Sequence, residues 1–288
     1  MEALSGEKVT LTSGLIHGFS ESILSQRYHE RKQTPACHLE WWDLCCSPYP
    51  LVAIAAPRGH AKSTAITHAY VLANMLFRQR HFCLIISDTY EQAVMFLKDI
   101  STEIEENEDL QAFFDIDPKF DKEAENDIIV RFNDGAKFRI MAKGSEQKVR
   151  GLKCDGKRPD LIVCDDLEND EIVMNEERRK KFQKWFMEAL LPSRSDSGIV
   201  RVVGTILHLD SLLENMMPPL HNKMYTVQEP LKSYSTNPRA MWKGVRYKAH
   251  PGFNDFSHIL WESKWPEKKL RDERQKYIEA GNPEGYSK

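Results

Sequence analysis

The chain has 288 residues, of which 41% are hydrophobic and 29% are charged, and its formal net charge is −3. This composition fits one large α/β domain, or one domain with a small appendage, and it excludes a chain that is disordered throughout. A net charge near zero neither favours nor excludes a nucleic-acid partner, so only local basic groups bear on that question. The longest apolar runs are too short to cross a membrane, and six cysteines without a disulfide spacing favour a reduced, intracellular protein.

Apolar runs alternate with segments of helical spacing from residue 51 onward, and this alternation predicts an α/β fold. Residues 1–36 are polar with weak helical periodicity, so we expect a helical lead-in there. Buried parallel strands are predicted at 51–56, 82–86, 161–164 and 199–203, and helices after the first two of them. The order β-α-β-α predicts a mostly parallel central sheet with helices on both faces.

The remaining segments are less regular. Residues 128–132 and 136–141 surround a glycine turn and predict a β-hairpin, whereas the acidic segment 101–127 is typical of a solvated helix end followed by a surface loop. A polar, basic loop is expected at 143–158. The further expectations are a helix near 175–190, a strand near 224–227 and a charged helix near 266–280.

The segment from Ala56 to Thr64 has the spacing of the phosphate-binding motif G-x-x-x-x-G-K-[ST], with alanine at both outer glycine positions. In such a loop, backbone N–H groups surround the β-phosphate, the lysine (Lys62) reaches the β- and γ-phosphates, and the Ser63 hydroxyl binds Mg²⁺. Ala61 departs from the motif, and Gly59 is the residue that could supply part of the missing flexibility. A Lys-Ser pair that merely begins a helix is the alternative. The candidate nucleotide-binding residues are Ala56, Pro57, Arg58, Gly59, His60, Ala61, Lys62, Ser63 and Thr64.

A second motif follows the apolar run 161–164. Asp165 ends this run at the edge where parallel sheets bind ligands, and it is the candidate Mg²⁺ ligand beside Ser63. Asp166 or Glu168 could activate the attacking water, and the sequence does not decide between them. An acidic helix cap is the alternative for these residues. Together the two motifs predict a P-loop NTPase of the ASCE/RecA-like type, with its core at 37–230.

These motifs, taken with their neighbours, resemble the ATPase domain of tailed-phage terminase large subunits. The supporting segments are His38–Leu44, Arg58 within the phosphate loop, Ser87–Ala93, Arg150-Gly151, Pro159–Asp166 and Gly204-Thr205. The resemblance spans about residues 35 to 285 and implies an ATP- and Mg²⁺-dependent motor that moves double-stranded DNA into a procapsid. It also implies a ring, usually a pentamer, on the portal protein, with a small terminase subunit as partner, in the host cytoplasm and transiently at the procapsid portal.

The resemblance assigns roles to individual residues. Arg58 would contact phosphates within its own subunit, and Arg150 is the best candidate for an arginine finger offered to a neighbouring subunit. Trp41, in the aromatic segment, would lie near the adenine, and Thr205 in Gly204-Thr205 would couple hydrolysis to movement. The chain departs from the family where Asp166, rather than Glu, follows the Walker B aspartate.

The C-terminal part and the basic groups complete the expectations. Residues 231–288 are expected to be a subdomain or linker leading to an absent nuclease domain, so nuclease activity is not expected from this fragment. The basic loop 143–158 could contact DNA or another subunit, whereas the basic residues at 178–184 are typical of a solvated helix face. Two alternative functions remain: another P-loop DNA translocase or helicase-like ATPase, and a nucleotide-binding scaffold without turnover.

Overall fold

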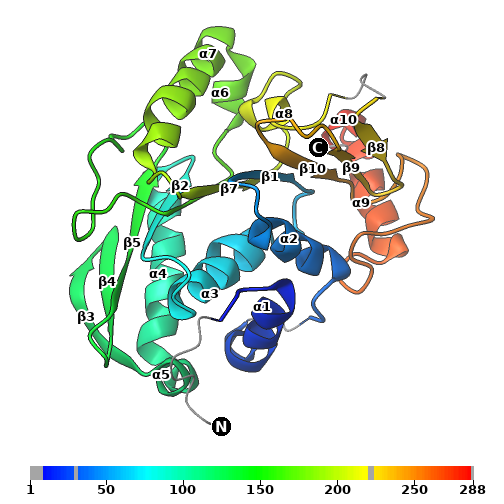
Figure 1. The fold of residues 1–288 in the computed structure, drawn as a ribbon. Helices are drawn as coiled ribbons and strands as arrows, with labels where there is room; N and C mark the ends of the chain where they lie inside the picture. Colours follow the sequence, from blue (N-terminus) through cyan, green and yellow to red (C-terminus); the bar gives the residue numbers. More distant parts are fainter. Residues whose placement is uncertain (1–8, 29–31, 220–223, 287–288) are drawn as a thin grey trace.

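The computed structural model describes residues 9–28, 32–219 and 224–286, and one mixed sheet runs through its centre (Figure 1). The six central strands pair in parallel, and an antiparallel ribbon flanks them on each side. In spatial order the strands are β3 (Ile116–Ala124), β4 (Asp127–Phe132), β5 (Lys137–Gly144), β2 (Phe82–Ser87), β6 (Leu161–Asp165), β7 (Ile199–Gly204), β1 (Leu51–Ala55), β10 (Lys243–Tyr247), β9 (Lys232–Ser235) and β8 (Thr226–Gln228).

Helices cover both faces of this sheet (Figure 1). The first face carries α1 (Ser13–Phe19), η1 (Ser20–Leu24), η2 (Ser25–Arg27), α2 (Ala36–Cys46), η3 (Thr64–Tyr70), α3 (Val71–Leu76), α4 (Tyr90–Glu106) and α5 (Glu108–Phe114). The second face carries α6 (Asp170–Met174), α7 (Glu176–Trp185), η4 (Phe186–Leu190), η5 (Leu191–Ser193) and α8 (Leu212–Asn215). The last helices, α9 (Glu267–Glu279) and α10 (Pro283–Tyr286), lie at the β8–β10 end.

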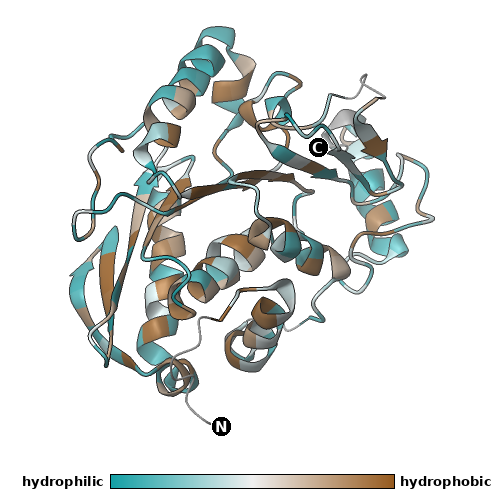
Figure 2. Ribbon diagram, viewed as in Figure 1, coloured by the Kyte–Doolittle hydropathy of each residue, from teal (hydrophilic) through white to brown (hydrophobic). Residues whose placement is uncertain are grey.

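The central strands are apolar along their whole length because both of their faces are covered. In β1, Val52 and Ile54 join the core on one face, whereas Leu51 and Ala53 join the core on the other. Each fully buried aliphatic side chain of this kind contributes roughly 1.5–3 kcal/mol. Figure 2 shows the apolar strands between helices whose outer surfaces are hydrophilic. The predicted fold, a mostly parallel sheet with helices on both faces, is confirmed.

The structure corrects the expectation for the acidic segment 101–127. Its second half forms β3, which pairs antiparallel with β4, so the predicted hairpin is part of a three-stranded ribbon. Asp121 on this strand forms ion pairs with Arg131 and Lys137, 2.7 and 2.8 Å away. Pairing with basic neighbours is what lets an acidic segment form a strand, and the acidic composition alone did not indicate it.

The C-terminal part extends the same sheet. The strand expected near 224–227 forms as β8, and the predicted boundary at residue 230 falls between β8 and β9, which pair with each other. β10 then pairs in parallel with β1. In the lead-in, residues 13–27 are helical, whereas residues 1–8 and 29–31 lie outside the described part. Among the described helices, none combines the length and hydropathy needed to cross a bilayer.

Candidate active site

Three segments singled out from the sequence meet at the carboxyl edge of the central strands. The phosphate loop leaves β1, the two aspartates follow β6, and Gly204-Thr205 ends β7, and these three strands are neighbours in the sheet. The Ala56 N–H donates to the Gly204 carbonyl (3.0 Å), and the Asp166 N–H donates to the Val203 carbonyl (2.9 Å). The sheet register therefore brings the candidate residues together.

Lys62 lies at the centre of this edge and is buried. Its Nζ donates to the Thr205 hydroxyl (2.9 Å) and to the Pro57 carbonyl (3.2 Å). Burial lowers the pKa of Lys62, while Asp166 and then Asp165 act in the opposite direction. Thr205 in turn donates its backbone N–H to Asp166 Oδ1 (3.1 Å). Lys62, Thr205 and Asp166 thus form one hydrogen-bonded chain across the three segments.

The five consecutive carbonyls from Ala56 to His60 each accept a hydrogen bond from a side chain. The donors are, in order, Thr205 Oγ1 (3.3 Å), Lys62 Nζ (3.2 Å), His60 Nδ1 (3.0 Å), Trp265 Nε1 (3.1 Å) and His38 Nε2 (2.9 Å). Burial lowers the pKa of both histidines to about 4, so each is neutral near neutral pH and carries its hydrogen on the nitrogen that faces a carbonyl.

With its carbonyls held by side chains, the loop leaves its amides free. Within the described part of the chain, the N–H groups of residues 58–63 donate to no other protein atom. Gly59 and Ala61 both have left-handed backbone angles, with φ of +73° and +53°. Alternation of this kind turns successive N–H groups toward one point and makes an anion-binding nest. Ala61 therefore adopts the conformation that the missing glycine would favour, at a strain of about 1–2 kcal/mol.

Asp165 is fully buried at the end of β6. Its Oδ2 accepts a hydrogen bond from the Thr67 hydroxyl (2.5 Å), whereas its Oδ1 has no hydrogen-bond partner within the described residues. Burial, and next the Asp166 charge, raise the Asp165 pKa to about 6, although hydrogen bonds from Thr67 and Ser63 lower it. A buried carboxylate oxygen without a donor, beside a serine hydroxyl, fits the oxygen ligand set of Mg²⁺.

Asp166 and Glu168, left as alternatives by the sequence, lie in different surroundings. Asp166 is exposed and has a left-handed backbone, and its Oδ1 is held by the Thr205 N–H. Glu168 accepts the N–H groups of Leu212 (2.7 Å) and Leu213 (3.1 Å), so both of its oxygens cap the start of α8. Burial raises the Glu168 pKa, and the two backbone hydrogen bonds act against this. Asp166 is the acid with an uncommitted oxygen next to Lys62.

The two arginines lie apart. Arg58 is exposed on the phosphate loop. Arg150 is exposed on the loop after β5, and its guanidinium donates to the Glu188 carbonyl (2.9 Å) on η4. Within the described residues, Arg150 makes no hydrogen bond or ion pair with the phosphate loop. The structure thus brings Arg58, but not Arg150, to the loop of its own chain.

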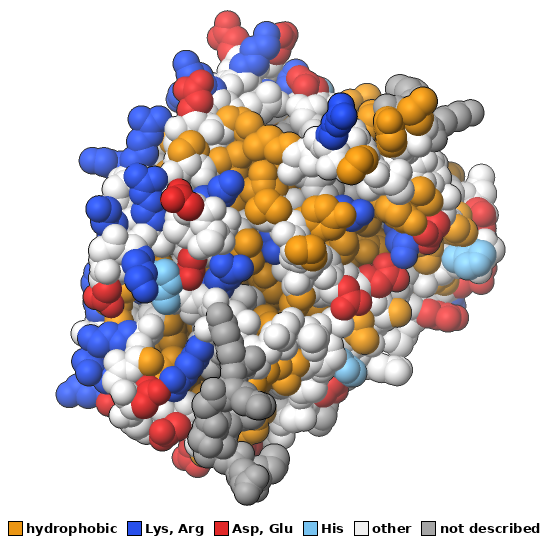
Figure 3. Space-filling model, viewed as in Figure 1, with side chains coloured by type: hydrophobic (Ala, Val, Ile, Leu, Met, Phe, Trp, Pro, Cys, Tyr) orange, Lys and Arg blue, Asp and Glu red, His pale blue; other side chains and the backbone are white. Residues whose placement is uncertain are grey.

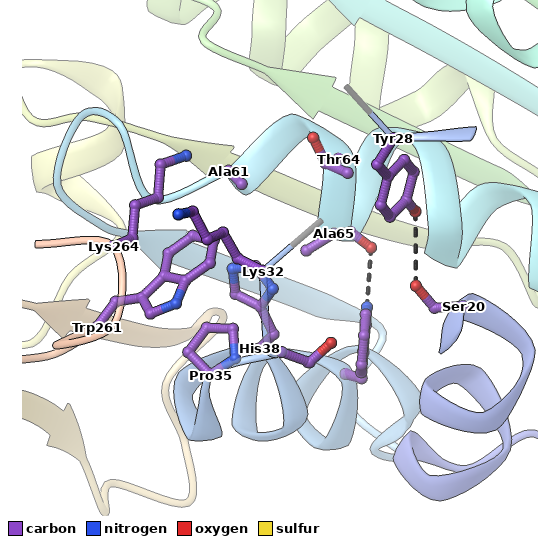
Figure 4. Close-up of a pocket in the computed structure, with 12 residues that line it drawn as sticks. Ser20, Tyr28, Lys32, Pro35, His38, Ala61, Thr64, Ala65, Trp261 and Lys264 are labelled. Atoms are coloured by element: carbon purple, nitrogen blue, oxygen red, sulfur yellow. Dashed lines mark hydrogen bonds between the residues drawn. The ribbon is translucent and has the colours of Figure 1, made fainter. Parts of the chain in front are cut away.

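A cavity of about 380 Å³ lies beside the phosphate loop and reaches Ala61 and Thr64 (Figure 4). Trp41 does not line this cavity, because it is fully buried against Tyr247, at a ring-centroid distance of 5.8 Å. Its neighbour Trp42 lines the cavity instead and donates its indole N–H to the Ala65 carbonyl (2.8 Å). The other lining residues are Ser20, Tyr28, Lys32, Thr34, Pro35, His38, Ala65, Trp261 and Lys264.

Sequence inspection missed Trp261, Lys264 and Trp265 at this site. They come from the segment before α9, and more than 200 residues separate Trp265 from its partner Gly59 (|i−j| of 206). No spacing rule connects residues so far apart, and their only sequence signal is two tryptophans in a charged stretch.

Comparison with known proteins places this fold. Neither a protein-family model nor a curated protein matches the chain. Among solved structures, the large terminase ATPase domain of Thermus phage P74-26 is similar over 88% of this chain and 94% of that chain, at 16% identity and a TM-score of 0.56. A mutant of that domain matches over 84% and 90%, at 16% identity and a TM-score of 0.54.

A third structure is more distant. The large terminase of a thermophilic bacteriophage, in complex with ADP, covers 84% of this chain and 50% of its own, at 10% identity and a TM-score of 0.44, too low to support an argument. The P74-26 matches cover nearly the whole of both chains. This chain therefore has the fold of the ATPase domain of phage large terminases.

Proposed function

We propose that this chain is the ATP-hydrolysing motor domain of a viral DNA-packaging large terminase, which moves double-stranded DNA into a procapsid. The observation that carries the proposal is the chain Lys62–Thr205–Asp166 beside the buried Asp165. It joins a phosphate-loop lysine, a strand-end hydroxyl and two acids at one sheet edge, which is the arrangement that phosphoryl transfer to water requires. A scaffold that only binds nucleotide would have no need for an uncommitted acid at this point.

In this proposal each residue has a defined task. The N–H groups of residues 58–63 bind the β-phosphate, and Lys62 leaves the Thr205 hydroxyl to bind between the β- and γ-phosphates. Ser63 and Asp165 hold Mg²⁺, which supplies positive charge against the developing negative charge of the phosphates. A water bonds to the γ-phosphorus as the bond to the β–γ bridging oxygen breaks, and Asp166 orients the water and accepts its proton. The products are ADP and inorganic phosphate.

The cavity beside the loop is the proposed place for the nucleoside. It opens at Ala61 and Thr64, where a bound nucleotide would leave the phosphate loop. The rings of His38 and Trp261 lie 5.1 Å apart at its wall, and Pro35 adds an apolar surface (Figure 4). Walls of this kind suit a flat, partly apolar base. In this proposal Trp42 and His38 take the adenine-side place that the resemblance gave to Trp41.

Asp166→Asn should lower kcat by at least about 100-fold while leaving the Kd for ADP within a few-fold of wild type. Asparagine tolerates the left-handed backbone and can still accept the Thr205 N–H, so it removes only the proton acceptor. Glu168→Gln should lower kcat less than about ten-fold and should mainly reduce thermal stability, because Glu168 caps α8. Steady-state phosphate release and ADP titrations measure both effects. The opposite ranking of the two variants would assign the base to Glu168.

Arg150 is proposed to complete the site of a neighbouring subunit in a ring, with the portal protein and a small terminase as further partners. Its guanidinium is exposed and, among the described residues of its own chain, bonded to the Glu188 carbonyl. Arg150→Ala should therefore keep ADP binding but lose the part of the specific activity that rises with protein concentration, about 1,000-fold when the site is fully assembled. Arg274→Ala is the matched control, because its guanidinium also donates to a carbonyl, that of Phe253 (3.0 Å). An equal loss at every protein concentration would exclude a role in trans.

The loop after β5 is the proposed contact for the DNA backbone. Lys148, Lys153 and Lys157 are exposed on it, and within the described residues none of them has a carboxylate within ion-pair distance. Figure 3 shows basic side chains gathered along the side of the molecule that carries α7, this loop and the β3–β4 ribbon. Unneutralised cations along an extended loop fit a polyanion that is bound through its phosphates rather than its bases.

Replacing Lys153 and Lys157 by alanine should weaken binding to a duplex of about 30 base pairs and lower the slope of log K against log salt by about two. The matched control replaces Lys248 and Lys268, two exposed lysines on the C-terminal part of the chain, by alanine. Fluorescence anisotropy over a salt series measures the slopes. Equal slopes for the two double variants would reject this surface as the DNA contact.

A further inference from the structure

Trp265 makes three contacts with the outer turn of the phosphate loop. Its indole N–H donates to the Gly59 carbonyl (3.1 Å). Its ring stacks on His60, with centroids 6.1 Å apart and planes 16° from parallel. A Cβ atom added at Gly59 would lie 2.6 Å from the Trp265 ring, so only glycine fits beneath it. Gly59 is thus required by its left-handed backbone and also by the tryptophan that covers it.

The surroundings of Trp265 separate this contact from the protein core. The side chain is half-buried and belongs to neither of the two core clusters, whereas the nearby Trp261 is buried. The Lys269 ammonium lies over the Trp265 ring, 4.1 Å from its centroid. The ring therefore lies between the phosphate loop and a cation on α9, and its removal takes little apolar surface out of the core.

We propose that Trp265 is a positioning residue for nucleotide binding, which holds the Gly59 carbonyl outward so that the following N–H groups stay turned toward the phosphates. This role rests on the proposed function, because it concerns the same loop. The physical reason is preorganisation. A loop whose carbonyls are already held loses less conformational entropy when a phosphate arrives, so it binds that phosphate more tightly. Of the five side-chain donors, Trp265 is the one supplied by the segment that leads into α9.

The contact also connects the C-terminal segment to the nucleotide. Gly59 lies two residues before Ala61, whose amide faces the nest, and Trp265 is the second residue before the start of α9. A shift of the Gly59 carbonyl on phosphate binding would move its hydrogen-bond donor as well. The fluorescence of Trp265 should therefore report ADP binding, with a change that Lys62→Ala weakens and Trp265→Phe abolishes.

The test measures ADP affinity by titration calorimetry for the full chain and three variants, in Mg²⁺ buffer. Trp265→Ala should weaken ADP binding about ten-fold, and Trp265→Phe, which keeps the stacked ring but loses the N–H, should weaken it less. Trp185→Ala is the control, because Trp185 is also half-buried and donates its indole N–H to a backbone carbonyl, that of Gln147 (3.3 Å). Thermal unfolding of each variant in the absence of nucleotide shows whether the fold is kept.

A double-mutant cycle identifies the contact itself. Gly59→Ala should cost more ADP affinity in the wild-type background than in the Trp265→Ala background, because only the former contains the ring at 2.6 Å. Additive effects, or equal affinity of wild type and Trp265→Ala, would overturn the positioning role. An equal loss in Trp185→Ala would assign the effect to general loosening and would overturn it too. Absence of ADP binding by the wild-type chain would overturn the proposed function, and the positioning role with it.

Discussion

Lys62→Ala should lower the steady-state rate of ATP hydrolysis by at least about 1,000-fold, because the γ-phosphate loses its cationic partner at the moment when negative charge develops on it. The wild-type ammonium is buried and held between the Thr205 hydroxyl and the Pro57 carbonyl, so it is in place before the nucleotide binds. Arg58 on the same loop is exposed, so its guanidinium is not held at this position and would not replace the lysine.

The control for this variant is Lys248→Ala, an exposed lysine on the C-terminal side of β10. Its hydrolysis rate should equal that of the wild type. A Lys62→Ala rate within about ten-fold of wild type would remove the phosphate-loop assignment, because a lysine at the reacting phosphate contributes more than that. Circular dichroism and thermal unfolding would exclude loss of the fold as the cause of inactivity.

Asp165→Asn should have two opposite effects: it should abolish Mg²⁺-dependent hydrolysis and stabilise the protein in the absence of metal and nucleotide. The Oδ1 of Asp165 is buried and, within the described residues, has no donor, so the carboxylate is held at a cost that only a cation can offset. Removing its charge should raise the free energy of unfolding by about 1–2 kcal/mol in the presence of a chelator.

The pH dependence of this stabilisation follows from the sign of the shift. The folded-state pKa of Asp165 is raised to about 6 from an ordinary value of 3.8, so the ionised form is disfavoured in the fold. The unfolded chain releases its proton first as the pH rises, and wild-type stability therefore falls between pH 3.8 and about 6. The advantage of Asp165→Asn should grow across this window and stay constant above it.

A second buried aspartate gives the matched control. Asp160 accepts the N–H groups of His81 and Phe82 as well as the His81 ring nitrogen, at 2.5–3.2 Å, so its carboxylate is fully engaged. Asp160→Asn should lower the free energy of unfolding, in contrast to Asp165→Asn. Urea unfolding of both variants with a chelator present measures the contrast. Destabilisation by both substitutions would show that Asp165 is a structural carboxylate rather than a metal ligand.

The sequence predicted the parts of the fold that are written in contiguous residues. β1 and β6 are apolar throughout because they are covered on both faces, so their runs indicated buried parallel strands, and the residues after them were the candidates for chemistry. β10 was not predicted, because its five residues include a glycine and an arginine and lie far from β1, their partner in the sheet. Pairing across such a distance is set by tertiary packing rather than by local pattern.

The candidate site was predictable to a similar extent. Residue types and spacing identified Lys62 and Asp165, and the register of neighbouring strands explains why they lie together. The choice between Asp166 and Glu168 depended on which acid caps α8, and the sequence carries no signal for that contact. Likewise, the aromatic segment lies beside the loop, but only the orientation of α2 puts Trp41 in the core and Trp42 on the cavity.

The most direct test of the central claim is the steady-state rate of ATP hydrolysis as a function of protein concentration, with Asp165→Asn measured in parallel as background. The account predicts Mg²⁺-dependent hydrolysis that requires Asp165 and rises faster than linearly with concentration, since subunits would complete each other's sites through Arg150. Hydrolysis that requires Asp165 but stays linear would contradict the shared site. ADP binding without Asp165-dependent hydrolysis at any concentration would contradict the motor itself and leave a nucleotide-binding scaffold.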